Sequence, residues 1–205
     1  MADPSVLPRW LMIRNKHSRR ASRERPAAGA PNDETGPVNQ APLTLRLRRP
    51  LEADHPQLVG VIDDWWGGRR LHELLPRVWL QHFTGTSWIA ETAAGELAGF
   101  LVGFISPDRP GEAYIHMIAT NPEMRRRAVA RTLYQAFFQD VAGRGVRHVK
   151  AITWAGNRVS IAFHKATGFR IVDGPGTTTI LGVTAFPGYD YPGEDRVVFI
   201  RDVQP

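Results

Sequence analysis

Three consecutive arginines, Arg125 to Arg127, stand where a strand pattern gives way to a helix pattern. Residues 113–120 are predicted as a buried strand, and after a proline-marked turn a helix is predicted from Arg125 to about Val141. The first amides of a helix have no partner within it and carry a partial positive charge, so they bind anions. Fixed cations and the small residues Ala128 and Ala130 beside those amides favour a polyphosphate site, with a solvated basic turn as the plainer alternative.

A row of polar side chains lies on a helix predicted over residues 157–167. This helix follows a strand predicted over residues 148–154. Asn157, Ser160 and His164 are spaced i, i+3 and i+7, so they share one face of that helix. Gly168 is typical of a helix C-terminus. The apolar face is predicted to consist of Val159, Ala162, Phe163 and Ala166.

His116 is the first candidate for a general base. Strand alternation predicts that it points the same way as Tyr114, Ile118 and Thr120. The pKa of an unperturbed histidine, about 6.5, suits removal of a proton near neutral pH, directly or through water. A core histidine held by a hydrogen bond is the equal alternative, and Glu112 in the preceding turn is the second candidate base.

The two segments together resemble the GNAT superfamily, the acetyl-CoA-dependent N-acyltransferases. In that family a pyrophosphate loop of the form Arg/Gln-x-x-Gly-x-Gly/Ala connects the fourth strand to the next helix. Residues 125–130 match that loop, with Ala128 in place of the first glycine. The substitution adds a Cβ where the phosphates approach the chain most closely. The resemblance covers about Leu43 to Val203 and does not identify the acceptor.

The later family pattern, Asn…Phe-Tyr-x-x-x-Gly-Phe, is matched by Asn157, Phe163 and Gly168-Phe169, with His164 in the tyrosine position. The resemblance implies that His164 contacts the cofactor and donates a proton to the leaving thiolate. It also implies that the strand before the loop splays from its neighbour, so that its free main-chain N–H groups hold the pantetheine arm and polarise the thioester. The implied cofactor contacts are Ile118, Ala119, Thr120, Arg125, Arg126, Arg127, Ala128, Val129, Ala130, Arg131, Asn157, Ser160 and His164.

Two segments are candidates for the acceptor pocket. Residues 63–70 combine carboxylates and indoles, which would suit a cationic amine, although Arg69 and Arg70 would repel it and paired tryptophans on a helix are often core. Residues 184–194 are rich in Gly, Pro and Tyr. They are predicted either as a lid or as an extended hairpin connection of the kind that exchanges partners in dimers.

The remaining pattern alternates strands with helices. Strands are predicted over 43–49, 87–92, 97–105, 169–172 and 196–202, and helices over 54–66 and 71–83. The predicted fold class is an α/β domain, a GNAT-like mixed and mainly antiparallel central sheet flanked by helices on both faces. This domain is predicted to span residues 43–205. Residues 1–42, rich in Arg, Pro and Ala, are predicted to be a disordered basic tail.

Composition narrows the function further. The 205 residues include no cysteine, which excludes disulfides and thiolate chemistry, and no apolar run is long enough for a membrane span. The net charge of +6 is concentrated at the start, where residues 1–26 hold seven Lys and Arg and two acids. No His/Asp/Glu group has metal-ligand spacing, so no metal is predicted. A basic nucleic-acid-binding module is the alternative to which this tail points.

The predicted function is a cytoplasmic N-acetyltransferase that moves an acetyl group from acetyl-CoA to a primary amine by direct attack in a ternary complex. The acceptor is left open between a small amine, an antibiotic, a polyamine and a protein amine. Neither a membrane nor a nucleic-acid partner is expected, and a homodimer is compatible with the family. The alternative is a GNAT-fold protein that binds CoA or another ligand without catalysis, which the replacements at Ala128 and His164 leave open.

Overall fold

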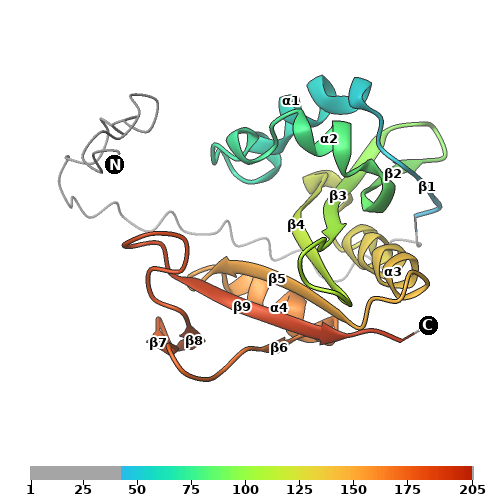
Figure 1. Cartoon of the computed structure of the whole chain (residues 1–205). Coiled ribbons are helices and arrows are strands. Elements are labelled where there is room, and N and C mark those ends of the chain that lie inside the picture. The colour runs from blue at the N-terminus through green and yellow to red at the C-terminus, as the bar shows by residue number, and fades with distance from the viewer. Residues whose placement is uncertain (1–42, 205) are drawn as a thin grey trace, which may run out of the picture. The chain divides into compact units, whose positions relative to one another are not determined.

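The computed structural model describes residues 43–204. Seven strands form one sheet in the order β1-β2-β3-β4-β5-β9-β6 (Figure 1), and only β4 and β5 are parallel neighbours. The predicted mixed, mainly antiparallel sheet is therefore confirmed. The tail predicted for residues 1–42 lies outside the described residues. The strands are β1 Leu45–Arg48, β2 Trp88–Thr92, β3 Leu97–Ile105, β4 Glu112–Thr120, β5 His148–Trp154, β6 Arg170–Ile171 and β9 Arg196–Asp202.

Helices cover both faces of the sheet, as predicted. Successive residues of β3 point to opposite faces, so Phe100 packs in a cluster with Leu58 and Ile62 of α1, and Leu101 packs in a cluster with Leu133 and Phe137 of α3. Figure 1 shows α1 and α2 on one side of β2–β4, α3 on the other, and α4 behind β5 and β9. The helices are α1 His55–Trp65, α2 Val78–His82, α3 Val129–Ala142 and α4 Arg158–Ala166, and short 3-10 turns are η2 Glu52–Asp54, η3 His72–Leu74, η4 Thr84–Thr86 and η5 Pro122–Met124.

The helix predicted over residues 71–83 is wrong, because the chain there forms η3 and then the short α2. Pro76 lies between the two turns. A proline disfavours helical angles at the residue before it, and Leu75 has φ −119° and ψ 56°. The resulting irregular segment brings the Leu74 carbonyl to β4, where it contacts His116.

The predicted apolar face of α4 is also wrong. Val159 is 82% exposed, whereas Ile161 and His164 are buried against the sheet. The larger side chains of Ile161 and His164 fill the space beside Phe199, so the two alanines counted in the predicted face remain exposed. The polar row Asn157, Ser160 and His164 therefore lies on the inner side of the helix.

A two-stranded hairpin, β7 Thr178–Ile180 and β8 Val183–Ala185, was not predicted. Its tight turn contains Leu181 at φ 51° and Gly182 at φ 75°. The chain continues through a bridge between Phe186 and Arg196 into β9, so the predicted lid or connection at residues 184–194 is the β8–β9 loop.

Candidate active site

A gap opens in the middle of the sheet, between the ends of β4 and β5. Their pairing stops at Ile115 and Ala151. β4 continues against β3 as far as Thr120, and β5 continues against β9 as far as Trp154. The last residues of the two parallel strands therefore do not pair with each other, and their main-chain groups on that side are free for a ligand.

The main chain of β4 shows which groups face the gap. The Asn121 N–H donates to the Ala98 carbonyl at 2.9 Å, so Asn121 turns its main chain towards β3. Alternate residues of a strand share that direction, so Ala119 also faces β3. Of the three predicted contacts on this strand, Ile118 and Thr120 turn their main-chain N–H groups to the gap.

A β-bulge lies at His116, the first residue beyond the paired part of β4 and β5. Val102 is opposite Met117 and Gly103 is opposite Ile115, so His116 is an extra residue on β4. Because of the bulge, residues two apart point to opposite faces of the sheet. Ile115 packs with the α3 cluster, whereas Met117 packs with the α1 cluster.

This reversal corrects the predicted orientation of His116. Tyr114 contacts Phe104, and His116 stacks on Trp79, which also contacts Phe104, so both point to the α2 side. Ile118 packs with the α3 cluster on the other side. The predicted alternation through residue 118 is therefore wrong, because the bulge inserts one residue between the two stretches.

The His116 ring is fixed in one neutral tautomer. It stacks on Trp79 with 4.1 Å between the ring centroids, and its Nε2 lies 2.8 Å from the Leu74 carbonyl oxygen. A carbonyl only accepts, so Nε2 carries the hydrogen and Nδ1 holds the free lone pair. Burial lowers the pKa of His116, so the ring is neutral near pH 7 and can accept a proton. Neither Trp79 nor Leu74 carries a signal in the sequence that links it to His116.

Residues 125–128 form a loop rather than the predicted first turn of a helix, and α3 begins at Val129. Arg126 and Ala128 have positive φ, at 61° and 64°, which ends the regular hydrogen-bond pattern there. Ala128 is the residue before the helix and makes no side-chain cap. The Ala128 side chain therefore accepts no hydrogen bond from the first amides of α3. The positive φ at residue 128 also explains why a glycine fits this position best.

The arginines of this loop differ in their contacts. Arg125 donates from Nη2 to the Trp65 carbonyl at 2.8 Å, which ties the loop to the end of α1. The Arg127 Nε is buried and has no hydrogen-bond partner among residues 43–204. Arg126 and Arg131 are exposed to solvent. Since a buried donor without a partner is costly, Arg127 fits a bound anion at this loop.

The start of α4, across the gap, is capped by the chain itself. The Asn157 side-chain oxygen accepts from the Ser160 N–H at 3.2 Å, and its Nδ2 donates to the Thr153 hydroxyl at 3.2 Å. Two of the predicted cofactor contacts, Asn157 and Ser160, thus already satisfy each other.

His164, the predicted proton donor, is 5% exposed and stacks on Phe199 with 4.4 Å between the ring centroids. Its Nδ1 lies 2.8 Å from the Ser160 carbonyl, so Nδ1 carries the hydrogen and Nε2 accepts from the Tyr134 hydroxyl at 3.0 Å. Burial lowers the pKa of His164. At neutral pH the structure therefore holds a neutral imidazole, whereas the predicted acid needs a protonated one.

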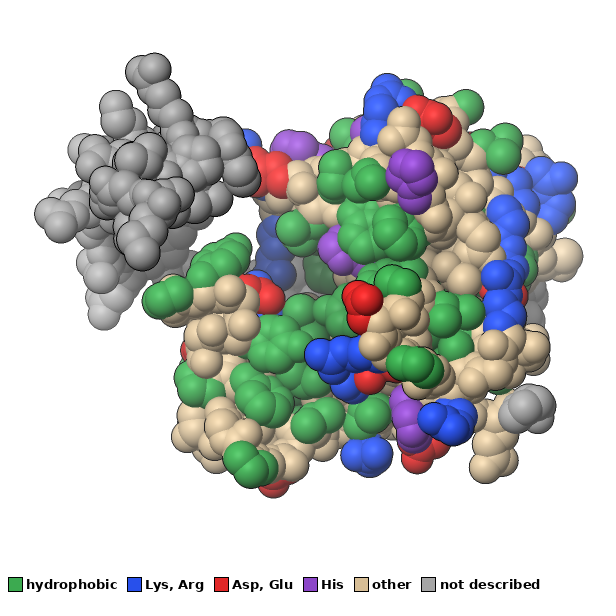
Figure 2. Space-filling view, in the orientation of Figure 1, with side chains coloured by type: hydrophobic (Ala, Val, Ile, Leu, Met, Phe, Trp, Pro, Cys, Tyr) green, Lys and Arg blue, Asp and Glu red, His purple; other side chains and the backbone are tan. Residues whose placement is uncertain are grey.

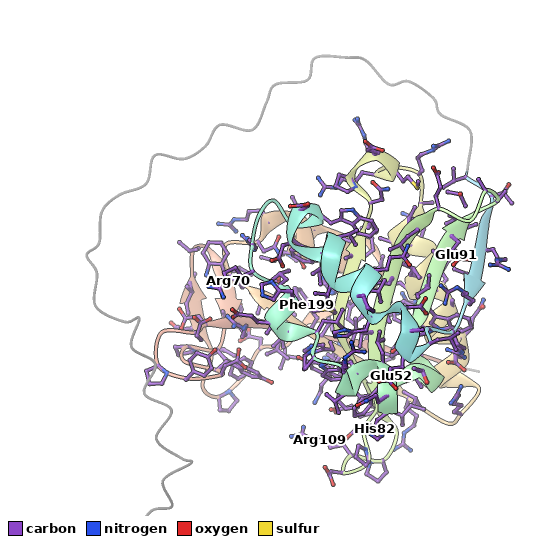
Figure 3. All side chains as sticks on the ribbon, turned by 90° about the horizontal axis from the view of Figure 1, so that it is seen from above. Glu52, Arg70, His82, Glu91, Arg109 and Phe199 are labelled. Carbon is purple, nitrogen blue, oxygen red and sulfur yellow. The ribbon has the colours of Figure 1, made fainter. Side chains whose placement is uncertain are left out.

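The side chains of the predicted acceptor segment at residues 63–70 contact nearby residues. The Asp63 carboxylate accepts from the His72 N–H at 2.9 Å and lies 2.5 Å from the His72 Nδ1. Arg70, labelled in Figure 3, lies 2.5 Å from Glu73. These contacts fold the segment after α1 back on itself, and Trp65 and Trp66 pack against the α1 cluster.

The β8–β9 loop is tied to the first residue of β9 by ion pairs. Arg196 pairs with Asp190 at 2.8 Å and with Glu194 at 2.9 Å. Burial raises the pKa of the Tyr114 hydroxyl. Figure 2 shows hydrophobic side chains gathered over β5 and β9, on the face without a helix. Tyr189 and Tyr191 of the loop are exposed.

The comparisons with known proteins agree with this geometry. The sequence pattern of the Acetyltransferase (GNAT) family matches residues 53–169, more than half of the chain. The chain belongs to the GNAT family. The match begins before α1 and ends at Phe169, so it includes both the gap and the loop before α3.

Individual relatives share 30% or less of their aligned residues with this chain. L-2,4-diaminobutyric acid acetyltransferase of Nocardia farcinica is 30% identical over 93 residues, 45% of this chain and 48% of the relative. The aligned part of the chain thus spans about half the length of this relative. Ard1 from Thermoplasma volcanium matches with a TM-score of 0.60 and 19% identity over 78% of this chain and 99% of that one.

Diaminobutyrate acetyltransferase EctA from Paenibacillus lautus, solved with L-2,4-diaminobutyric acid and coenzyme A, matches with a TM-score of 0.56. Its identity is 20%, over 78% of this chain and 95% of that one. At this identity the two structures establish the shared fold. Among residues 43–204, no helix is long and apolar enough to cross a membrane, and no group of three or more residues has metal-ligand geometry.

Proposed function

We propose that this protein is an N-acetyltransferase that transfers an acetyl group from acetyl-CoA to a primary amine in a ternary complex. The observation that carries the proposal is the gap between β4 and β5, which leads directly to the uncapped start of α3. A thioester with a diphosphate at its far end matches this arrangement, because free strand amides and free helix amides lie at successive points along one path.

The diphosphate is held by the loop before α3. Main-chain N–H groups of residues 126–130 donate to the phosphate oxygens. The Nε of Arg127, which has no partner among residues 43–204, adds a charged donor. Arg126 and Arg131 contribute positive charge from the surface. Along β4, the N–H groups of Ile118 and Thr120 hold the pantetheine arm. This assignment leaves Ala119 as a β3-paired residue between them.

His116 is the general base. It lies at the inner end of the gap, where the thioester of an arm bound along β4 would lie. Its Nδ1 lone pair removes the proton of the attacking amine, while Leu74 and Trp79 hold the ring. The amine nitrogen bonds to the thioester carbon, the main-chain N–H groups of β4 stabilise the oxyanion, and the carbon–sulfur bond breaks.

The leaving thiolate is a stable anion and takes its proton from solvent. We assign His164 a positioning role instead of the acid role implied by the family pattern, because its Nε2 already accepts from Tyr134. Together the two side chains connect α3, which carries the phosphate loop, to α4. The pair thus fixes the width of the groove between these helices.

The acceptor class follows from charge at the β8–β9 loop. Asp190 and Glu194 outnumber Arg196, their shared partner, so the loop has a net negative charge that suits a cationic amine. A small diamino acid is the first acceptor to test, since the relatives from Nocardia farcinica and Paenibacillus lautus act on L-2,4-diaminobutyric acid by name.

The proposal is tested by measuring release of free CoA thiol from acetyl-CoA with a panel of amines that includes diamino acids, polyamines and peptides. Amine-dependent release is expected, with a product mass 42 Da above that of the acceptor (roughly the mass of an added acetyl group less a proton). Saturable acetyl-CoA binding without release by any amine would favour the non-catalytic alternative instead.

We also propose that residues 43–205 form the catalytic domain and that residues 1–42 are a separate tail. A truncated chain that starts at Leu43 is expected to keep full turnover. The cytoplasmic location, the homodimer and the independence of the reaction from a metal stay predictions. Size-exclusion chromatography with light scattering measures the oligomeric state, and an assay in excess chelator measures metal dependence.

A further inference from the structure

A hollow of about 300 Å³ lies between α3 and the end of α4, outside the gap in the sheet. The residues of α3 that line it lie one, two and three helical turns after the loop of residues 125–128. Arg201 of β9 lines another side. Its lining combines apolar and polar side chains. The lining residues are Arg131, Tyr134, Gln135, Phe138, Ala166, Thr167, Gly168 and Arg201.

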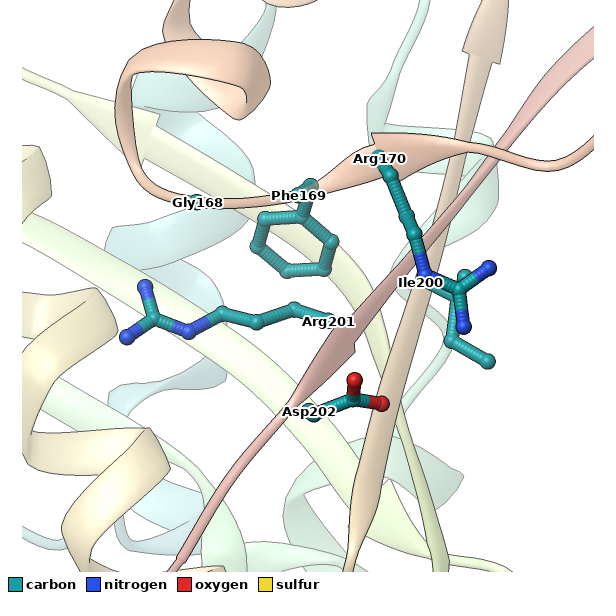
Figure 4. A pocket seen from close by; sticks show the side chains of 6 residues that line it. All are labelled: Gly168, Phe169, Arg170, Ile200, Arg201 and Asp202. Carbon is teal, nitrogen blue, oxygen red and sulfur yellow. The ribbon is translucent and has the colours of Figure 1, made fainter.

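Arg201 is held in place by two contacts, and Gly168 leaves room for it. Its Nη1 donates to the Thr167 carbonyl, and its guanidinium lies over the Phe138 ring, 4.2 Å from the ring centre. At Gly168, which has φ 86°, an added Cβ would lie 3.2 Å from the Arg201 Nη1. Figure 4 shows the guanidinium extended below Gly168. A guanidinium so fixed loses little conformational freedom when it binds an anion.

Arg131 lies on the opposite wall, three residues after Ala128, and its side chain is exposed. Neither Arg131 nor Arg201 forms an ion pair with a carboxylate within residues 43–204. Two arginines that have no acidic partner in the described part of the chain therefore face one hollow. Arg201 also offsets the partial negative charge at the carboxyl end of α4, which would otherwise oppose an anion.

A neighbouring hollow of about 340 Å³ on the other side of Arg201 differs in charge. It is lined by Arg170 and also by Asp202, which lies 2.7 Å from the His148 Nδ1. A carboxylate in the wall repels a phosphate. The hollow between α3 and α4 is thus the better anion site of the two, and Arg170 provides a matched control for it.

We propose that the hollow between α3 and α4 binds the 3′-phosphate of the CoA ribose, between Arg131 and Arg201. The inference rests on the proposed acyl donor. Coenzyme A carries this third phosphate on the same nucleotide as the diphosphate, and Arg131 lies about one helical turn from the loop that receives the diphosphate. The small residues Ala166 and Gly168 leave room beside Arg201 for the ribose. The site makes the protein selective for CoA over its 3′-dephospho form.

The test compares acetyl-CoA with 3′-dephospho-acetyl-CoA by titration calorimetry. The native chain is expected to bind acetyl-CoA roughly tenfold more tightly, as one charge-assisted phosphate contact implies. Arg131→Ala is expected to reduce that ratio to about twofold or less, because the exposed side chain is removed without loss of packing. Arg170→Ala, with the same change in net charge, is expected to keep the native ratio. Arg201→Lys, which retains the charge, provides a second variant with an intermediate ratio.

Four results would overturn the inference. Equal affinity of the native chain for the two thioesters would show that no site for the 3′-phosphate exists. An equal loss in the Arg131 and Arg170 variants would show a general effect of net charge. If neither thioester binds the folded chain, the proposed function fails as well, which distinguishes that outcome from the first. Competition by inorganic phosphate against both thioesters alike would assign the hollow to free phosphate and contradict the proposal.

Discussion

Two helices follow neighbouring parallel strands in this molecule, and their first turns are built in opposite ways. α3 follows β4 through a loop of arginines with positive φ at Arg126 and Ala128, and no side chain of Ala128 caps it. α4 follows β5 directly, and Asn157 caps it. The two starts have the same topology and dipole, so the difference in capping decides which one is available to an anion.

The histidines near these two helix starts differ in whether their second ring nitrogen has a hydrogen-bond partner among residues 43–204. Burial lowers the pKa of both His116 and His164, and both donate to a main-chain carbonyl. The second nitrogen of His116 has no hydrogen-bond partner among residues 43–204, whereas that of His164 accepts from the Tyr134 hydroxyl. A low pKa therefore does not by itself identify a catalytic residue. The free nitrogen beside the gap distinguishes His116.

The largest expected effect follows from replacing His116. His116→Ala should lower kcat by roughly 10²–10⁴-fold, since a positioned base is lost, and should leave the acetyl-CoA affinity nearly unchanged. Steady-state kinetics with calorimetry separates the two quantities. His148→Ala is the control, because His148 pairs with Asp202 at the other end of β5. Unchanged kcat in His116→Ala would remove the assigned base.

Replacing His164 should affect stability more than chemistry. His164→Phe keeps a ring against Phe199 but leaves the buried Tyr134 hydroxyl without its acceptor, which should cost about 1–3 kcal/mol in the free energy of unfolding. Adding Tyr134→Phe should recover part of that loss. Denaturant unfolding measures both. A drop in kcat as large as that of His116→Ala, with stability intact, would restore the acid role.

The same histidine gives stability a pH dependence of known sign. The pKa of His164 is lowered in the folded state, so the unfolded chain binds the proton first as the pH falls. Its contribution is complete above about pH 6.5 and is lost as the pH falls through the folded-state pKa. The His164→Phe variant should therefore lose less stability than the native chain does when the pH falls from about 6.5, the ordinary histidine pKa, to about 5. Equal slopes in the two proteins would contradict this.

Removing the cap of α4 should produce a smaller change. Asn157→Ala is expected to cost about 1 kcal/mol of unfolding free energy and to leave the acetyl-CoA affinity within about twofold, if Asn157 only caps the helix. A loss of affinity well beyond twofold would instead support the cofactor contact that the family pattern implies. Thermal unfolding and calorimetry on the same preparation decide between these roles.

The smallest expected effect is a gain. Ala128 has φ 64°, a conformation that costs an L-residue about 1 kcal/mol more than glycine. Ala128→Gly should therefore stabilise the chain by up to about 1 kcal/mol and bind acetyl-CoA at least as tightly, because it relieves this strain. Val129→Ala, at a buried neighbouring position, should do the reverse for stability. Weaker acetyl-CoA binding by the glycine variant would show that the Cβ of Ala128 contributes to the site.

How much could be predicted depends on whether the determinant is local. The strands at residues 148–154 and 196–202 have the predicted bounds, because their alternation of side chains reflects one buried face. The short α2 had a local signal in Pro76 that the helical spacing of its neighbours obscured. The positive φ values that delay α3 to Val129 have no signal in the helical spacing of the residues.

The candidate site residues follow from residue type and the family pattern, and their geometry does not. The segments that carry His116, the arginine loop and His164 were singled out from their residues and the family pattern. The bulge at His116 was not, because an extra residue leaves no mark on the sequence and still reverses every later side chain of β4. Likewise the Tyr134 partner of His164 lies on another helix and reads as an ordinary core residue.

The central claim is that main-chain amides between Arg126 and Ala130 bind the diphosphate of acetyl-CoA. Its most direct test is a titration of the ¹⁵N-labelled chain with acetyl-CoA, followed through each backbone amide resonance. The account predicts saturable shifts that are largest at residues 126–130, with further shifts at Ile118 and Thr120 and smaller ones at Ala119. Saturable binding that leaves the amides of residues 126–130 unmoved would contradict it.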